Sequence, residues 1–208
     1  MMSNAIEFVI FDQDGVLYDF DEKGRVEAFA RLAGRPAEEV EAAIWGSGFD
    51  DDADAGTPDT AEAYLAGFAA RLGSPLAAHD FFRVRRSMMR PSPHVLALAN
   101  MVAETVEAAV LTNNNMLYKQ GLEICAPELV EIFGENIHVS AEFGRRKPDP
   151  QIFRDLCERY GYPTHATLFV DDKLTNIEGA QKAGLKTHLF EDFKGLKRVL
   201  TDHNLLDH

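Results

Sequence analysis

Long apolar runs are missing from this 208-residue sequence. No window approaches the ~18 consecutive apolar residues that a membrane-spanning helix needs. The N-terminal stretch MMSNAIE has no basic segment followed by an apolar one, so it does not have the pattern of a secretion signal. We therefore expect a soluble protein of the cytoplasm with no membrane partner.

Cysteines and basic residues are also scarce. The two cysteines, Cys125 and Cys157, have neither the number nor the spacing of a disulfide framework or a zinc site, which is typical of a reducing compartment. Lys and Arg total 21 against 34 Asp and Glu, and the formal net charge is −13. Nucleic-acid binding needs clustered cations, so we expect no nucleic-acid partner. A local positive site for a small anion is still compatible with an acidic chain.

Short apolar runs are present instead, and they alternate with helical patterns. They cover residues 6–11, 106–111, 137–140, 167–171 and 186–190. Alternating strands and helices are typical of a mostly parallel sheet covered on both faces, so the fold class that we predict is α/β, a three-layer Rossmann-like core.

Helix signals lie between the later strands. Asp149, followed by a proline, has the pattern of an N-cap, and Gly161 lies near the expected end of that helix. Thr175 and Glu178 have the spacing of a capping box for the next helix, which Gly184 can close.

The interval between the first two core strands has a different pattern. Residues 18–91 show no strand signal but several amphipathic helical patterns, and they are too many for a simple crossover. We therefore predict two domains: an α/β core made of residues 1–17 and 92–208, and a helical cap inserted at residues 18–91. The length of the chain suits one domain with such an insertion.

Within this interval, the acidic stretch FDDDADAG (residues 49–56) has some features of a calcium loop. The sixth position is Ala55 rather than glycine, and the twelfth is Ala61 rather than glutamate, so a solvated turn is the favoured interpretation. For Trp45 and Phe49, packing between cap helices is favoured over contact with a substrate.

Pairs of acidic residues follow two of the predicted strands. Asp12 and Asp14 come directly after the first strand, with Gly15 allowing a sharp turn, and Asp171 and Asp172 end the fourth. An Asp-Gly pair alone is more often a turn cap. Because the carboxyl ends of parallel strands meet at one edge of the sheet, the four carboxylates together suggest a site for a hard cation such as Mg²⁺.

Groups suited to phosphate lie at the same predicted edge. Thr112 and Asn113 end the second strand before a helix start, and Lys147 precedes another helix in FGRRKPDP. Each signal alone also fits a helix cap or a solvated surface. With the acidic pairs, they predict a site for a phosphorylated ligand.

Four segments, in order, resemble the four motifs of the haloacid dehalogenase-like hydrolases: FDQDGVL, LTNNN, Lys147 in RRKPDP, and VDDKLTNIEGA. The resemblance covers nearly the whole chain and includes a helical cap after the first motif, as in the helical-cap (C1) subgroup. It implies that the first strand lies between the second and the fourth. RKPDPQIF and DDKLTNIEGAQKAG look most similar to the α-D-glucose-1-phosphate phosphatase-like members.

The resemblance implies catalytic roles for individual residues. Asp12 would attack phosphorus to form an aspartyl-phosphate, and Asp14 would protonate the leaving alcohol and then activate water. Thr112, the amide of Asn113 and Lys147 would hold the phosphoryl oxygens. Mg²⁺ would be held by Asp12, the backbone carbonyl of Asp14 and Asp172, with Asp171 as another candidate ligand.

The implied activity is a Mg²⁺-dependent phosphatase that acts on a small phosphorylated metabolite, similar to a sugar phosphate. Dehalogenases of this family lack an acid two residues after the nucleophile, so Asp14 favours phosphate-ester chemistry. A phosphomutase, a dehalogenase and a noncatalytic binding protein on the same fold are the other hypotheses. The substrate partner would be a small molecule, and the chain would be a monomer or a homodimer.

Overall fold

The computed structural model describes residues 5–206. Its main sheet has five parallel strands in the order β5-β4-β1-β6-β7. The strands are β1 (Phe8–Phe11), β4 (Glu107–Thr112), β5 (Ile137–Val139), β6 (Thr167–Asp171) and β7 (Lys186–Leu189). All five were expected from the apolar runs, and β1 lies between β4 and β6 as predicted.

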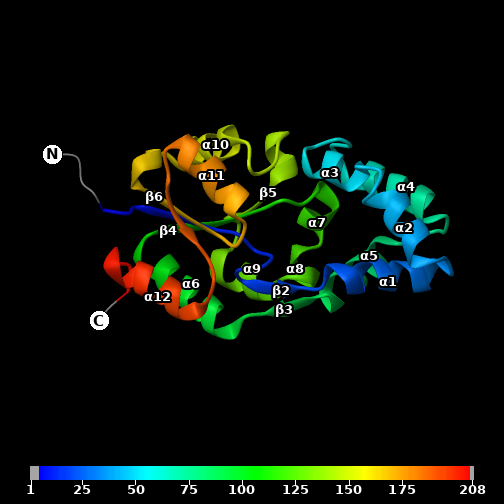
Figure 1. Ribbon diagram of the computed structural model, residues 1–208, viewed down its shortest axis with the longest axis horizontal. Helices are drawn as coiled ribbons and strands as arrows, with labels where there is room; N and C mark the ends of the chain where they lie inside the picture. Colours follow the sequence, from blue (N-terminus) through cyan, green and yellow to red (C-terminus); the bar gives the residue numbers. More distant parts are fainter. Residues whose placement is uncertain (1–4, 207–208) are drawn as a thin grey trace.

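Alternation along β1 explains how the sheet is covered on both faces. Val9 and Phe11 belong to one hydrophobic cluster, with α6 (Pro93–Thr105), α9 (Pro127–Phe133) and α12 (Phe193–Asp202). Phe8 and Ile10 belong to another, with α10 (Pro150–Tyr160) and α11 (Leu174–Ala183). Figure 1 shows these two helix layers on opposite sides of the sheet. The predicted three-layer α/β fold is confirmed.

The inserted interval contains five helices beyond the carboxyl ends of the core strands (Figure 1). They are α1 (Glu22–Ala33), α2 (Ala37–Ile44), α3 (Phe49–Asp54), α4 (Ala61–Leu72) and α5 (Ala78–Ser87). A cap formed by residues 18–91 stays a prediction, and we use the word cap for these five helices. None of the helices in residues 5–206 is long and apolar enough to cross a membrane.

The expectation that residues 18–91 contain no strand was wrong. Strands β2 (Tyr18–Phe20) and β3 (Met89–Pro91) pair antiparallel at the two ends of the interval. Each strand has three residues, which is too short to show a period-two pattern, and the pairing depends on backbone groups far apart in sequence. This two-stranded β2–β3 ribbon holds together the two segments through which the chain leaves the core and returns to it.

The expected solvated turn at residues 49–56 was also wrong, because Phe49–Asp54 form α3. Three aspartates in its first turn suit the positive end of a helix. Asp50 accepts hydrogen bonds from Nε1 of Trp45 (2.8 Å) and the hydroxyl of Tyr64 (2.6 Å). The ring of Trp45 packs against Phe29 and Phe68, which confirms the packing interpretation.

Most of the predicted caps on the core helices are correct. Asp149 caps α10, and Gly161 and Gly184 end α10 and α11 in the left-handed conformation. The capping box at Thr175 was wrong, because α11 begins at Leu174. The amide of Lys173 instead donates to the carboxylate of Asp171. The remaining helices are α7 (Met116–Gln120), α8 (Leu122–Cys125) and the 3₁₀ turns Ser140–Phe143 and Thr164–Ala166.

Candidate active site

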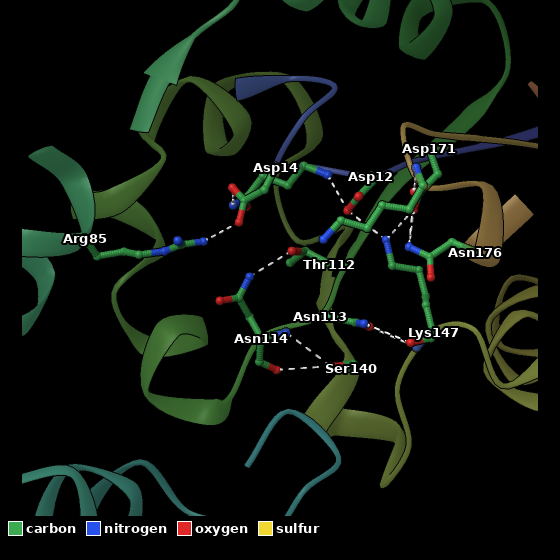
Figure 2. A network of polar contacts seen from close by, with 12 residues as sticks. Asp12, Asp14, Arg85, Thr112, Asn113, Asn114, Ser140, Lys147, Asp171 and Asn176 are labelled. Atoms are coloured by element: carbon green, nitrogen blue, oxygen red, sulfur yellow. Dashed lines mark hydrogen bonds and ion pairs between the residues drawn. The ribbon is translucent and has the colours of Figure 1, made fainter. Parts of the chain in front are cut away.

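Side chains from three neighbouring strand ends meet at the carboxyl edge of the sheet (Figure 2). Asp12 directly follows β1, Thr112 ends β4 and Asp171 ends β6. Lys147 reaches the same point from the loop before α10 and is buried. The parallel topology therefore brings together residues that are up to 159 positions apart (171 − 12).

A buried cation lies between two carboxylates at this edge. Nζ of Lys147 is 2.7 Å from Oδ1 of Asp12 and 2.8 Å from Oδ2 of Asp171. Burial alone would lower the pKa of Lys147, but the two carboxylates outweigh it and raise that pKa above its ordinary value. Burial would raise the pKa of Asp171, yet Lys147 and several hydrogen bonds hold it below its usual range. Lys147 and Asp171 are therefore both charged.

Asp12 has one engaged oxygen and one open oxygen. Its Oδ1 accepts from the backbone amide of Gln13 (2.7 Å) and contacts Lys147, whereas no residue among 5–206 donates to Oδ2. Burial raises the pKa of Asp12 well above its ordinary value, and the nearby Lys147 offsets only part of this effect. A carboxylate oxygen without a donor, fixed at the end of a buried strand, is suited to nucleophilic attack.

Asp14 lies in a different environment from Asp12. Nε2 of Gln13 donates to its Oδ1 (2.9 Å), and Nη2 of Arg85 donates to its Oδ2 (2.5 Å). Gln13 is held in turn by the hydroxyl of Tyr118 (2.8 Å). The two carboxylates of the first motif therefore have separate partners, Lys147 for Asp12 and Arg85 with Gln13 for Asp14.

Arg85 comes from α5 in the inserted interval, and sequence reasoning missed it. It is 5% exposed, and its guanidinium lies 4.0 Å from the ring centre of Phe20. Its neighbour Arg86 pairs with Glu128 of α9 (2.9 Å), which also accepts from the hydroxyl of Tyr18 (2.6 Å) and ties α5 to the core. A signal was available: a helix places Arg85 three and four positions after two phenylalanines, on the apolar face, where a buried arginine needs an anionic partner.

The polar residues after β4 form a connected network (Figure 2). The side chain of Asn113 exchanges hydrogen bonds with the backbone of Lys147, donating to its carbonyl (3.0 Å) and accepting from its amide (2.9 Å). Nδ2 of Asn114 donates to the hydroxyl oxygen of Thr112 (2.8 Å). Oγ of Ser140 accepts from the amide of Asn114 (3.1 Å) and donates to the carbonyl of Asp54 in α3 (2.6 Å). Asn114, which the sequence places among the polar residues that end the second strand, and Ser140, which sequence reasoning did not select, thus link the cap to Thr112.

The arrangement fits a hard cation. One oxygen from each of Asp12, Asp171 and Asp172 lies within 4.8 Å of the others. Both oxygens of Asp171 already accept hydrogen bonds, from Lys147, the Lys173 amide and Nδ2 of Asn176. Asp172 is less buried, and burial and the charge of Asp171 raise its pKa. Carboxylate oxygens are the ligands that Mg²⁺ prefers.

Gly15 is required where the first motif meets Asp172. Its φ is +93°, and a Cβ on Gly15 would lie 2.3 Å from Oδ2 of Asp172. A side chain at this position would therefore be strained and would displace the carboxylate.

The site residues expected from sequence are all at this edge of the sheet. Asp12, Thr112, Lys147 and Asp171 are buried, and Asp14 is partly open. Asn113 is close to Lys147, and Asp172 is close to Gly15.

Comparison with known sequences identifies a family and two relatives. The model of the family described as haloacid dehalogenase-like hydrolase matches residues 6–184. A phosphatase of Mycobacterium tuberculosis is 32% identical over 200 residues, covering 90% of this chain and 88% of that protein. A glyceraldehyde 3-phosphate phosphatase of Methanopyrus kandleri is 26% identical over 113 residues, covering 54% of this chain and 47% of its own.

Comparison with solved structures supports the fold. An enzyme of the same family from Bacteroides thetaiotaomicron superposes with a TM-score of 0.77 at 24% identity, covering 93% of this chain and 99% of its own. The same enzyme has been solved in complex with magnesium and inorganic phosphate; that structure has a TM-score of 0.75 at 24% identity and covers 92% of this chain and 98% of its own.

Proposed function

Because the chain belongs to the haloacid dehalogenase-like hydrolases, we propose that it is a Mg²⁺-dependent phosphatase that hydrolyses a small phosphorylated metabolite through an aspartyl-phosphate intermediate. One observation carries this proposal: Asp12 and Asp14 are two residues apart but have separate partners. Two carboxylates in different environments can have different roles, one as nucleophile and one in proton transfer.

The proposed reaction has two steps. Oδ2 of Asp12 attacks phosphorus, the bond from phosphorus to the leaving oxygen breaks, and Asp14 gives that oxygen a proton. Asp14 then takes a proton from water, whose oxygen attacks phosphorus; the bond to Asp12 breaks and inorganic phosphate leaves. Thr112, the amide of Asn113 and Lys147 hold the three equatorial oxygens, where charge is spread in the transition state.

Mg²⁺ would be held by Asp12, the backbone carbonyl of Asp14 and Asp172. Asp172 is preferred to Asp171 as a direct ligand, because both oxygens of Asp171 already accept hydrogen bonds. When bound, the ion would neutralise charge on the phosphoryl oxygens and reduce repulsion among the carboxylates. The complex of the Bacteroides enzyme with magnesium and phosphate supports the choice of Mg²⁺ as the ion.

For the substrate, we propose a small molecule similar to a sugar phosphate. The Methanopyrus relative, named for a three-carbon sugar phosphate, supports this size class. Asp14 argues against dehalogenation, since a halide leaves without a proton. The cap lies beyond the carboxyl edge of the sheet, so it is placed to exclude water and to contact the leaving alcohol.

A panel of phosphate esters tests the proposal. Purified protein is assayed for phosphate release with Mg²⁺ and with EDTA, alongside Asp12→Asn and the exposed control Asp19→Asn from β2. We expect release that needs Mg²⁺, is lost in Asp12→Asn and is kept in Asp19→Asn. Full activity in Asp12→Asn would contradict the assignment of Asp12 as the nucleophile. An isomerised sugar phosphate as product would identify a mutase. Protein that binds the esters but releases no phosphate and isomerises nothing would contradict the enzyme proposal.

A further inference from the structure

A small cavity lies between the cap and the core beside the proposed catalytic residues. The space open to the centre of a water-sized group is about 20 Å³, so the cavity admits only a compact group. One residue separates it from each of two proposed catalytic residues, because its lining residue Arg85 bonds to Asp14 and its lining residue Asn114 bonds to Thr112. A leaving alcohol that is protonated by Asp14 would therefore lie next to this cavity.

Two residues that line the cavity have a buried donor without an acceptor. Nε of Arg85 and Nε of Arg25 are both shielded from solvent, and neither has a hydrogen-bond partner among the described residues. Arg85 is 5% exposed, and its guanidinium is held between the rings of Phe20 (4.0 Å) and Tyr118 (4.9 Å). A buried donor without an acceptor is destabilising, and a guanidinium fixed in this way is already oriented to bind an anion.

The anionic acceptor that lines the cavity is already used. Asp50, the acid among the lining residues, accepts from Tyr64 at Oδ1 and from Trp45 at Oδ2, and its Oδ2 lies 3.6 Å from Nη1 of Arg25, so Nε is the open donor of that arginine. Oδ1 of Asn115 caps α7 by accepting from the amide of Tyr118 (3.1 Å). The cavity therefore offers donors and lacks free carboxylate acceptors, so a ligand group that only accepts fits better than a hydroxyl, which also donates.

We propose that this cavity is a subsite for a carboxylate on the leaving alcohol, and that the substrate is a small phosphorylated hydroxy acid, sugar acids included. Arg85 and Arg25 donate to the carboxylate while the phosphoryl group lies against Asp12, Thr112 and Lys147. This inference rests on the proposed phosphatase activity and narrows its substrate class. The cavity size selects a compact group, and the unpartnered Nε–H of each arginine is a charged donor that suits a carboxylate oxygen.

Esters matched in size test the subsite. The pairs are 3-phosphoglycerate with glycerol 3-phosphate, and phosphoglycolate with 2-hydroxyethyl phosphate; each pair differs by a carboxylate against a hydroxymethyl group. We expect kcat/KM to favour the carboxylate ester by about tenfold to a hundredfold, the range for one charge-assisted hydrogen bond. p-Nitrophenyl phosphate, which has no carboxylate, reports the phosphatase activity separately.

Two substitutions probe the donors. In Arg85→Gln the ratio of kcat/KM for the carboxylate ester to kcat/KM for its hydroxymethyl partner should fall to within about threefold of one. Because both rates come from the same variant, damage to Asp14 or loss of folded protein cancels in the ratio. Arg25→Gln, which leaves the Arg85–Asp14 contact in place, should lower the ratio as well. Arg83→Gln, a substitution of an exposed arginine on the same helix, should leave it unchanged.

The outcomes separate this inference from the proposed function. A ratio near one in the unmodified protein, or a ratio kept in both Arg85→Gln and Arg25→Gln, overturns the carboxylate subsite. Hydrolysis of p-nitrophenyl phosphate without hydrolysis of either hydroxy-acid ester overturns it too. Absence of phosphate release from every ester, p-nitrophenyl phosphate included, contradicts the phosphatase proposal itself.

Discussion

Replacing Lys147 with methionine removes the cation between two buried carboxylates. Nζ of Lys147 lies 2.7 Å from Asp12 and 2.8 Å from Asp171, and the three side chains are 1%, 7% and 0% exposed. Removing one member of a buried charge cluster costs about 3–5 kcal/mol, because the remaining charges stay desolvated and unpaired. For a chain of this length, such a loss lowers the melting temperature by about 6–20 °C.

The free energy of unfolding that is lost in Lys147→Met should depend on pH. In the unmodified protein, the lowered pKa of Asp171 stabilises the fold above the ordinary carboxyl pKa of about 3.9, and this contribution is lost as pH falls through the folded-state value. In Lys147→Met both carboxylates would have raised pKa values and bind protons more readily when folded. The variant therefore gains stability as pH falls, and its deficit relative to the unmodified protein narrows from pH 8 to pH 5.

Urea unfolding in EDTA at several pH values measures the deficit, and phosphate release measures activity. Activity should fall by at least about a hundredfold, since Lys147 is placed to hold phosphoryl oxygens. Lys182→Met, a substitution of an exposed lysine on α11, serves as control and should change neither. A deficit below about 1 kcal/mol, or one that widens as pH falls, would refute the reasoning.

Three further predictions concern single positions. Gly15→Ala should lower the free energy of unfolding in urea by about 1–3 kcal/mol and raise the Mg²⁺ concentration needed for activity, because the new Cβ meets Asp172. Gly34→Ala is the control: Gly34 also has a positive φ but has open space around it, so the Mg²⁺ requirement should stay unchanged. Ser140→Ala should destabilise by about 1–3 kcal/mol in the same assay, because buried partners lose their hydrogen bonds. Burial raises the pKa of Cys125 to about 11, so alkylation by iodoacetamide at pH 8 should be at least about a hundredfold slower than in urea; equal rates would contradict that burial.

The core strands and the residues at their ends could be predicted from the sequence. Buried parallel strands are short apolar runs, and their common direction places Asp12, Thr112 and Asp171 at one edge whatever the length of chain between them. Lys147 was recognisable because its motif precedes a helix with clear cap signals.

Contacts made by the inserted interval could not be predicted in the same way. Arg85 reaches Asp14 only because α5 docks against the core, and Ser140 bonds to α3 because two distant segments meet. No local pattern encodes such contacts. The β2–β3 ribbon was missed for a related reason, since three-residue strands show no period and form through pairing across the whole insertion.

The capping box at Thr175 failed because a stronger local partner was present. A carboxylate at Asp171, held by Lys147 and Asn176, already accepts the amide of Lys173 at the start of α11. Asp171, which ends β6, thus also provides the hydrogen-bond acceptor for the amide at the start of α11. Sequence spacing alone does not show whether a capping box at Thr175 or the carboxylate of Asp171 begins the helix.

Chemical trapping of the phosphorylated residue tests the central claim most directly. Protein turning over its best ester with Mg²⁺ is quenched in acid and reduced with borohydride, which converts a phosphorylated aspartate to homoserine, and the peptides are sequenced by mass spectrometry. The account predicts homoserine at position 12, and none in Asp12→Asn or without substrate. Homoserine at another aspartate, or phosphate release with none at position 12, would contradict it.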